Sequence, residues 1–102
     1  ARVFLITNSK NEIFIRKREG KGLLSGLYEF PWEEDDSLNF DSKDTTLEVS
    51  HVFTHFKLVL KIQILSAEEI DLKGQFVPQE TLQNYPFSTL MKKVYKKYLN
   101  AN

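Results

Sequence analysis

The chain has 102 residues, of which 41% are hydrophobic and 27% charged, with 14 Lys and Arg against 14 Asp and Glu. This size and composition predict one folded domain, and the net charge of zero argues against a free-standing cationic DNA binder while leaving room for a local basic patch. Because the chain contains no cysteine, disulfides, a Cys-ligated zinc site and an iron–sulfur cluster are excluded from this segment.

The start of the chain is predicted to form a hairpin followed by an exposed loop. Arg2–Thr7 is an apolar run of strand-forming residues, Asn8–Asn11 is a cluster of turn residues, and Ile13–Arg16 predicts a second strand. The stretch from residue 16 to residue 26 carries arginine, lysine and three glycines, which is typical of a surface loop.

The next segment combines a short strand with a long polar stretch. Leu27–Trp32 predicts a strand that is ended by Pro31 and by the acidic run Glu33–Asp36. The polar residues Ser37–Thr46 predict a loop.

The strongest strand prediction is Phe56–Leu65, because apolar residues alternate along it. One face carries Phe56, Leu58, Leu60, Ile62 and Ile64. The preceding stretch Leu47–Phe53 is also typical of a strand, so the two stretches are expected to pair as a hairpin with Thr54 and His55 near the bend.

The end of the chain is predicted to be helical after one more short strand at Gly74–Val77. Pro78–Asn84 predicts a short helix with proline near its start, where a missing N–H matters little. Thr89–Leu99 predicts an amphipathic helix with Ser88 as its N-cap. Strands first and helices late indicate the α+β class.

Three segments, in this order and spacing, resemble the C-terminal domain of MutY-type adenine DNA glycosylases. Gly22–Pro31 resembles the family signature G-L-L-x-G-L-[WY]-E-F-P, His51–Phe56 resembles H-x-F-[ST]-H-x, and Tyr85–Val94 is similar to a terminal helix L-P-x-x-x-x-M-x-K-[VIL]. The resemblance covers nearly the whole chain. It implies a Nudix-like (MutT-like) fold, with a mixed or antiparallel β-sheet, a short helix and a C-terminal amphipathic helix.

Nudix hydrolases hold divalent metals on a helix with an R-E-x-x-E-E pattern, and this chain departs from that pattern. Residues 32–40 follow Pro31 with no Arg-Glu pair and no acidic residues at helical spacing. The resemblance therefore implies the fold without the pyrophosphohydrolase chemistry or its metal site. The acidic run Glu33–Asp36 is interpreted as a solvated loop, with weak cation binding as the alternative.

MutY proteins remove adenine mispaired with 8-oxoguanine, and the resemblance implies that their catalytic residues and [4Fe–4S] cluster lie in an N-terminal domain that is absent here. This segment alone is then expected to have no catalytic residues and no cofactor, and to read the oxidised guanine. The implied partners are double-stranded DNA carrying 8-oxoguanine opposite adenine and the parent's own N-terminal catalytic domain. A monomer is expected.

The chemistry of the lesion points to Thr54. Guanine presents two acceptors, N7 and O6, in the major groove, whereas oxidation at carbon 8 converts N7 into a donor. A hydroxyl can accept that hydrogen bond, and serine is the residue associated with this position in many relatives. Phe53 is expected to press against the damaged pair, and His55 to bind a phosphate or brace the loop. Structural alternatives stay open: Phe53 as a core residue, Thr54 as a turn residue and His55 as a loop-stabilising group.

Basic residues supply a second set of candidate contacts. Arg16, Arg18 and Lys21 lie next to the Gly-rich loop and are predicted either to touch the DNA backbone or to lie in a solvated loop. The exposed face of the C-terminal helix carries Lys92, Lys93, Lys96 and Lys97, which suit either the helix C-terminus or DNA. His51 is interpreted as structural.

Two features bear on the setting of the protein. No apolar run reaches the roughly 18 residues of a membrane helix and no signal peptide is visible, so we expect an intracellular, bacterial protein of the cytoplasm or nucleoid. The chain starts Ala-Arg-Val without Met, which suggests one domain cut from a longer protein. The alternatives to lesion recognition are a Nudix-type nucleotide pyrophosphohydrolase, which the missing acidic helix disfavours, and a protein-interaction module.

Overall fold

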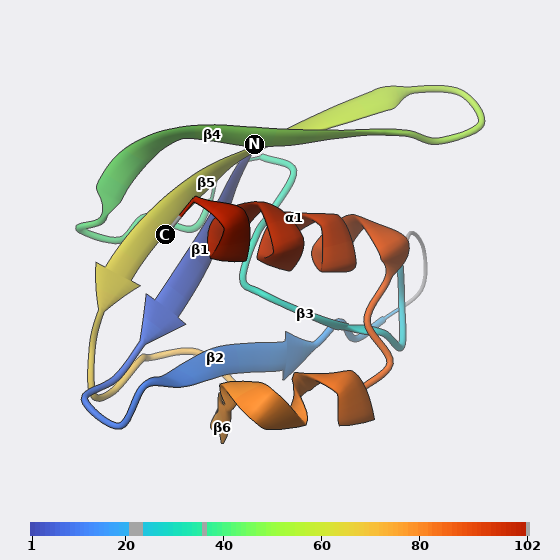
Figure 1. Cartoon of the computed structure of the whole chain (residues 1–102). Helices are drawn as coiled ribbons and strands as arrows, with labels where there is room; N and C mark the ends of the chain where they lie inside the picture. Colours follow the sequence, from blue (N-terminus) through green and yellow to red (C-terminus); the bar gives the residue numbers. More distant parts are fainter. Residues whose placement is uncertain (21–23, 36, 102) are drawn as a thin grey trace.

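A computed structural model of the chain describes residues 1–20, 24–35 and 37–101. Within them, six strands and two helices form a mixed sheet with helix α1 packed along it (Figure 1). In chain order the elements are β1 (Arg2–Thr7), β2 (Glu12–Lys17), β3 (Tyr28–Glu29), β4 (Lys43–Val52), β5 (Lys57–Ser66), β6 (Gln75–Pro78), the 3₁₀ helix η1 (Gln79–Asn84) and α1 (Thr89–Asn100). The α+β class, with a mixed sheet, a short helix and a C-terminal helix, is as expected.

Strand β1 lies in the middle of the sheet and is buried on both faces. It pairs antiparallel with β2 on one side and parallel with β5 on the other, in the strand order β3-β2-β1-β5-β4 with β6 joined to β2. Val3 and Leu5 belong to the larger core, which includes the buried face of α1, whereas Phe4 and Ile6 belong to a smaller core on the other face. This double burial explains why β1 is a continuous apolar run rather than an alternating one.

The hairpin of β4 and β5 is longer than the sequence indicates. Residues 37–46 are expected to form a loop, but β4 begins at Lys43, which pairs with Ile64 of β5. A register shift follows between Asp44 and Glu48, and within it the Thr45 hydroxyl donates to the Ile62 carbonyl at 2.8 Å. The polar residues therefore cover the edge of β5, which would otherwise present unpaired backbone groups.

The expected strand at residues 27–32 is shorter in the structure. Only Tyr28 and Glu29 form β3, beside β2, while Pro31 and Trp32 turn back toward β1. The Pro31 carbonyl accepts the Phe4 N–H at 2.9 Å, and Trp32 is buried, so it is a core residue.

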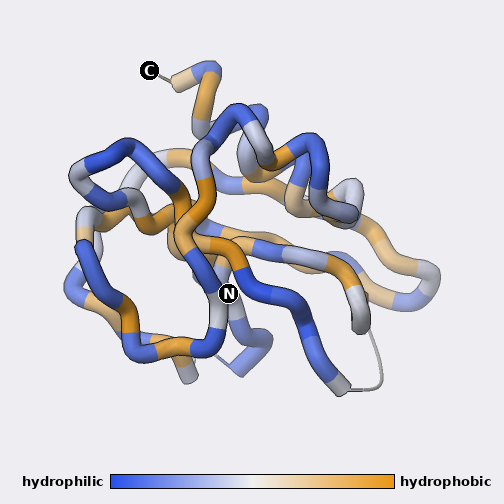
Figure 2. Tube along the Cα trace, turned by 90° about the horizontal axis from the view of Figure 1, so that it is seen from below, coloured by the Kyte–Doolittle hydropathy of each residue, from blue (hydrophilic) through white to orange (hydrophobic). Residues whose placement is uncertain are grey.

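The two helices form where predicted. The first is a 3₁₀ helix rather than an α-helix and starts after Pro78. In α1, the Ser88 hydroxyl accepts the Met91 N–H at 3.2 Å, which confirms the N-cap prediction. The apolar face of α1 is buried while its lysines are exposed, and Figure 2 shows hydrophobic stretches in the middle of the molecule with hydrophilic stretches along its outer loops. Neither helix in the described ranges is long and apolar enough to cross a membrane.

Candidate nucleic-acid interface

The turn between β4 and β5 brings the lesion-reading candidates together at the surface. The hairpin runs past the N-terminal end of α1 and ends in a turn at residues 53–56 (Figure 1). The Phe53 N–H donates to the Phe56 carbonyl at 2.7 Å, which makes Thr54 and His55 the two central residues of this turn. Both side chains are exposed. The expected place of Thr54 and His55 at a hairpin bend is therefore confirmed.

The rings of His51, Phe53 and Phe56 pack together at the base of the turn. The Phe53 ring stacks on the Phe56 ring with centroids 4.9 Å apart, and it meets the edge of the His51 ring at 4.8 Å. Phe53 is half-buried and packs against the main core, so the structure favours its core alternative at least in part. Phe53 thus holds the turn in place from the strand side.

Phe56 is a surface ring, although the alternation predicts it on the apolar face of the strand, and it lies just before β5. It is 47% exposed, because the hairpin extends past the core at this position and the Phe53 ring covers only part of it. Its position immediately before β5, next to the turn, is the signal that would have marked it. Val52, which is 73% exposed, lies on the opposite face of the hairpin, so each face has one exposed apolar side chain near the turn.

His51 connects the hairpin to α1. Its Nδ1 lies 3.2 Å from the Nζ of Lys93. Because an ammonium group has only donors, Nδ1 accepts this hydrogen bond and the ring proton lies on Nε2. This contact agrees with the structural role expected of His51, and it places one cation of α1 beside the strand that carries the turn.

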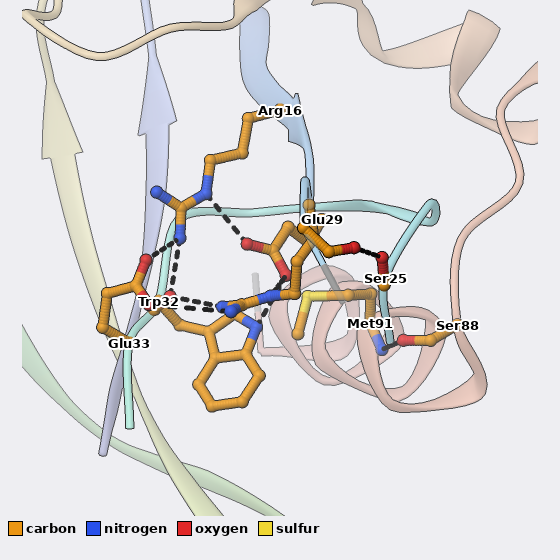
Figure 3. A network of polar contacts seen from close by, with 9 residues as sticks. Arg16, Ser25, Glu29, Trp32, Glu33, Ser88 and Met91 are labelled. Carbon is orange, nitrogen blue, oxygen red and sulfur yellow. Dashed lines mark hydrogen bonds and ion pairs between the residues drawn. The ribbon is translucent and has the colours of Figure 1, made fainter. Parts of the chain in front are cut away.

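Arg16 and Arg18 lie in a network around the buried carboxylate of Glu29 (Figure 3). That carboxylate accepts hydrogen bonds from Arg16 Nε at 2.8 Å, Arg18 Nε at 2.7 Å and Trp32 Nε1 at 2.9 Å. The Trp32 carbonyl accepts from both guanidinium groups, at 2.6 Å from Arg16 and 2.8 Å from Arg18. The two arginine side chains are only 14% and 19% exposed, so their donors point into the domain.

The acidic side chains around Arg18 favour its charged form. Burial acts to lower the pKa of Arg18, but the hydrogen bond to Glu29 and the charges of Glu29, Glu33 and Glu34 together raise this pKa above its ordinary value. Glu33 pairs with Arg16 at 2.6 Å, so the first residue of the acidic run is part of the network and not a freely solvated loop residue. No local sequence pattern marks Glu29, because Arg16 in β2 and Arg18 just after it reach Glu29 only in the folded sheet.

The remaining basic and acidic candidates lie partly outside the residues that the structure describes. Lys21 and Gly22 lie outside the described residues, and so does Asp36 of the acidic run. In the part of the chain that the structure describes, no three His, Asp or Glu side chains are grouped to hold a metal ion, and residues 33–35 and 37–42 form no helix.

Comparisons with known proteins agree on one family. The model of the NUDIX domain matches residues 2–97. Human adenine DNA glycosylase is 29% identical over 112 aligned residues, which cover 85% of this chain and 20% of that protein, so the chain spans about one fifth of this relative's length. In the crystal structure of the complex between the C-terminal domain of mouse MUTYH and human PCNA, one chain matches with a TM-score of 0.74 and 19% identity, over 98% of this chain and 86% of that chain.

Proposed function

The chain belongs to the NUDIX domain family, and we propose that it is the lesion-recognition domain of an adenine DNA glycosylase in base excision repair, reading 8-oxoguanine opposite a mispaired adenine. The resemblance to MutY-type C-terminal domains is confirmed by the sequence relative and the matching fold. The observation that carries the proposal is the exposed hydroxyl of Thr54 at the turn of a projecting hairpin within this fold.

In this proposal Thr54 reads the polarity of the lesion. Its hydroxyl oxygen accepts the hydrogen bond from the N7–H that oxidised guanine gains, whereas on intact guanine it would have to donate to N7. The closed turn fixes the backbone that carries Thr54, and Phe53 supports the turn through the stacked rings. His55, exposed beside Thr54, is assigned to a phosphate or to bracing the turn.

Arg16 and Arg18 have a smaller role in DNA binding in this proposal than the sequence suggests. DNA contact by them and by Lys21 stays a prediction, but the ion pairs with Glu29 and Glu33 favour a structural role for both arginines. They hold the segment after β2 against β3, and so support the domain rather than the DNA.

We assign adenine excision to the absent part of the parent and no catalytic step to this chain. The chain has no cysteine for the family's [4Fe–4S] cluster, so in this proposal the cluster lies in the N-terminal domain. Magnesium-dependent release of pyrophosphate from an oxidised guanine nucleotide by this chain would instead support the hydrolase alternative.

The test compares the binding of two duplexes, one with 8-oxoguanine and one with guanine opposite adenine, by this chain at the same salt concentration. Thr54→Val keeps the shape of the side chain and removes the hydroxyl, so the preference for the oxidised duplex should fall by roughly two- to tenfold, which corresponds to about 0.5–1.5 kcal/mol, the net contribution of one hydrogen bond. Thr54→Ser keeps the hydroxyl and is the matched control, which should retain the preference. A Thr54→Val variant with an unchanged preference would contradict the proposal and favour a protein-interaction module.

A further inference from the structure

Helix α1 carries a concentration of positive charge that the neutral net charge of the chain conceals. Its exposed face presents Lys92, Lys93, Lys96 and Lys97, and its 12 residues include no acidic side chain. The compensating carboxylates lie elsewhere, in runs such as Glu33–Asp36 and Glu68–Asp71. Positive and negative charges are therefore separated along the chain, and the exposed face of α1 is strongly basic.

The helix dipole accounts for Lys97, which lies in the last turn of α1, but not for Lys92 and Lys93 in its N-terminal half. The pairs 92/96 and 93/97 place like charges four residues apart, which disfavours the helix. An anionic partner would relieve this repulsion.

The basic face lies beside the lesion-reading hairpin. Helix α1 packs along β4, and Lys93 contacts His51 at 3.2 Å. The His51 ring in turn meets Phe53, which supports the turn that holds Thr54. Lys97 lies one helical turn from Lys93 on the same side of α1. Side-chain contacts therefore link Lys93 to the turn that carries Thr54.

We propose that the lysine face of α1, with Lys93 and Lys97 nearest the hairpin, binds the phosphate backbone of the same duplex whose damaged base the turn reads. This inference rests on the proposed function and adds to it the surface that holds the duplex. Lys93 keeps two further N–H donors while it donates to His51, and an ammonium is a strongly hydrated point charge that suits a surface phosphate. Such contacts orient the domain on the duplex without reading sequence.

The experiment measures how DNA affinity depends on salt. Each neutralised phosphate contributes about 0.9 to the slope of log K against log salt, so Lys93→Gln combined with Lys97→Gln should reduce the slope by roughly 1.8. This corresponds to an affinity loss on the order of fiftyfold at 0.1 M salt, equal for the oxidised and the intact duplex. Lys93→Arg with Lys97→Arg keeps the charges and should restore the slope.

The matched control is Lys10→Gln with Lys43→Gln, which removes the same charge from the exposed turn after β1 and from the start of β4. An equal loss of slope in the control and in the α1 variant, or no loss in either, would overturn the inference. The ratio of affinities for the two duplexes, measured in the same titrations with Thr54→Val, tests the proposed function separately. Absence of binding to both duplexes at low salt would refute both.

Discussion

Replacing Glu29 by alanine removes a buried carboxylate. This carboxylate joins the end of β2 to β3 and to the start of the acidic run. The Glu29 side chain is 3% exposed, and its carboxylate accepts from Arg16, Arg18 and Trp32. Without it, two guanidinium groups and a buried indole N–H lose their acceptor at the same time. The carbonyl of Trp32 and the carboxylate of Glu33 would remain as partial substitutes.

The expected loss of unfolding free energy is about 3–5 kcal/mol, the usual effect of removing one partner of a buried ion pair. The unpaired indole N–H alone would account for about 1–3 kcal/mol of that. Since domains of this size are stable by only about 5–15 kcal/mol, the variant should be marginally folded. Glu29→Gln should lose less, because one oxygen remains as an acceptor.

Urea unfolding followed by tryptophan fluorescence measures this directly, because Trp32 is the single tryptophan and lies in the network. The matched control is Glu19→Ala, which breaks an ion pair with Lys73 whose side chains are 64% and 85% exposed, and it should leave the unfolding midpoint unchanged. A loss below about 1 kcal/mol for Glu29→Ala, the size of an average substitution, would show that the network does not hold the fold.

Two further changes test the packing of the domain. Gly74→Ala should lower stability by about 1–3 kcal/mol, because its Cβ would lie 2.5 Å from Phe14 Cζ and 2.6 Å from the Ile15 carbonyl oxygen. Thermal unfolding measures this loss. Gly26→Ala is the comparison, because Gly26 has a φ of +84° but open space around it, so that variant reports backbone strain without a clash. Burial, and then the charges of Tyr98 and Glu80, raise the pKa of Tyr95 in the folded chain. Because the folded chain holds this proton more tightly than the unfolded chain, the contribution of Tyr95 to the unfolding free energy is lost as pH rises through the folded pKa. Tyr95→Phe should therefore flatten the fall in stability above about pH 10, and identical pH slopes for variant and wild type would refute this.

The predictions that succeeded depend on patterns within short segments. Alternation identified β5, helical spacing identified α1, and Ser88 marked its start, because these signals need no knowledge of distant residues. The bend at Thr54 and His55 followed directly from two adjacent strand patterns.

What the sequence could not provide depends on strands that meet only in the folded domain. Arg16 and Glu29 are register partners across β2 and β3, and that pairing turns two predicted surface cations into buried ion pairs. Similarly, β4 begins early because β5 offers it a partner, and Phe56 is exposed because the core ends before the hairpin does. The contact between His51 and Lys93 joins residues 42 positions apart, so no local pattern marks it.

The distribution of cation types bears on how a neutral domain could discriminate a lesion. Each arginine is engaged within the domain, since Arg2 donates to the Leu38 carbonyl while Arg16 and Arg18 bind Glu29. Arginine near the reading turn would donate to both N7 and O6 of intact guanine and so favour the wrong base. If the turn reads the lesion as proposed, the arginines are held inside the fold and lysines lie beside the hairpin. The lysines can then attract phosphates without favouring undamaged guanine. Exchanging Lys93 for arginine should then preserve affinity, whereas arginine in place of Thr54 should reverse the preference between the two duplexes.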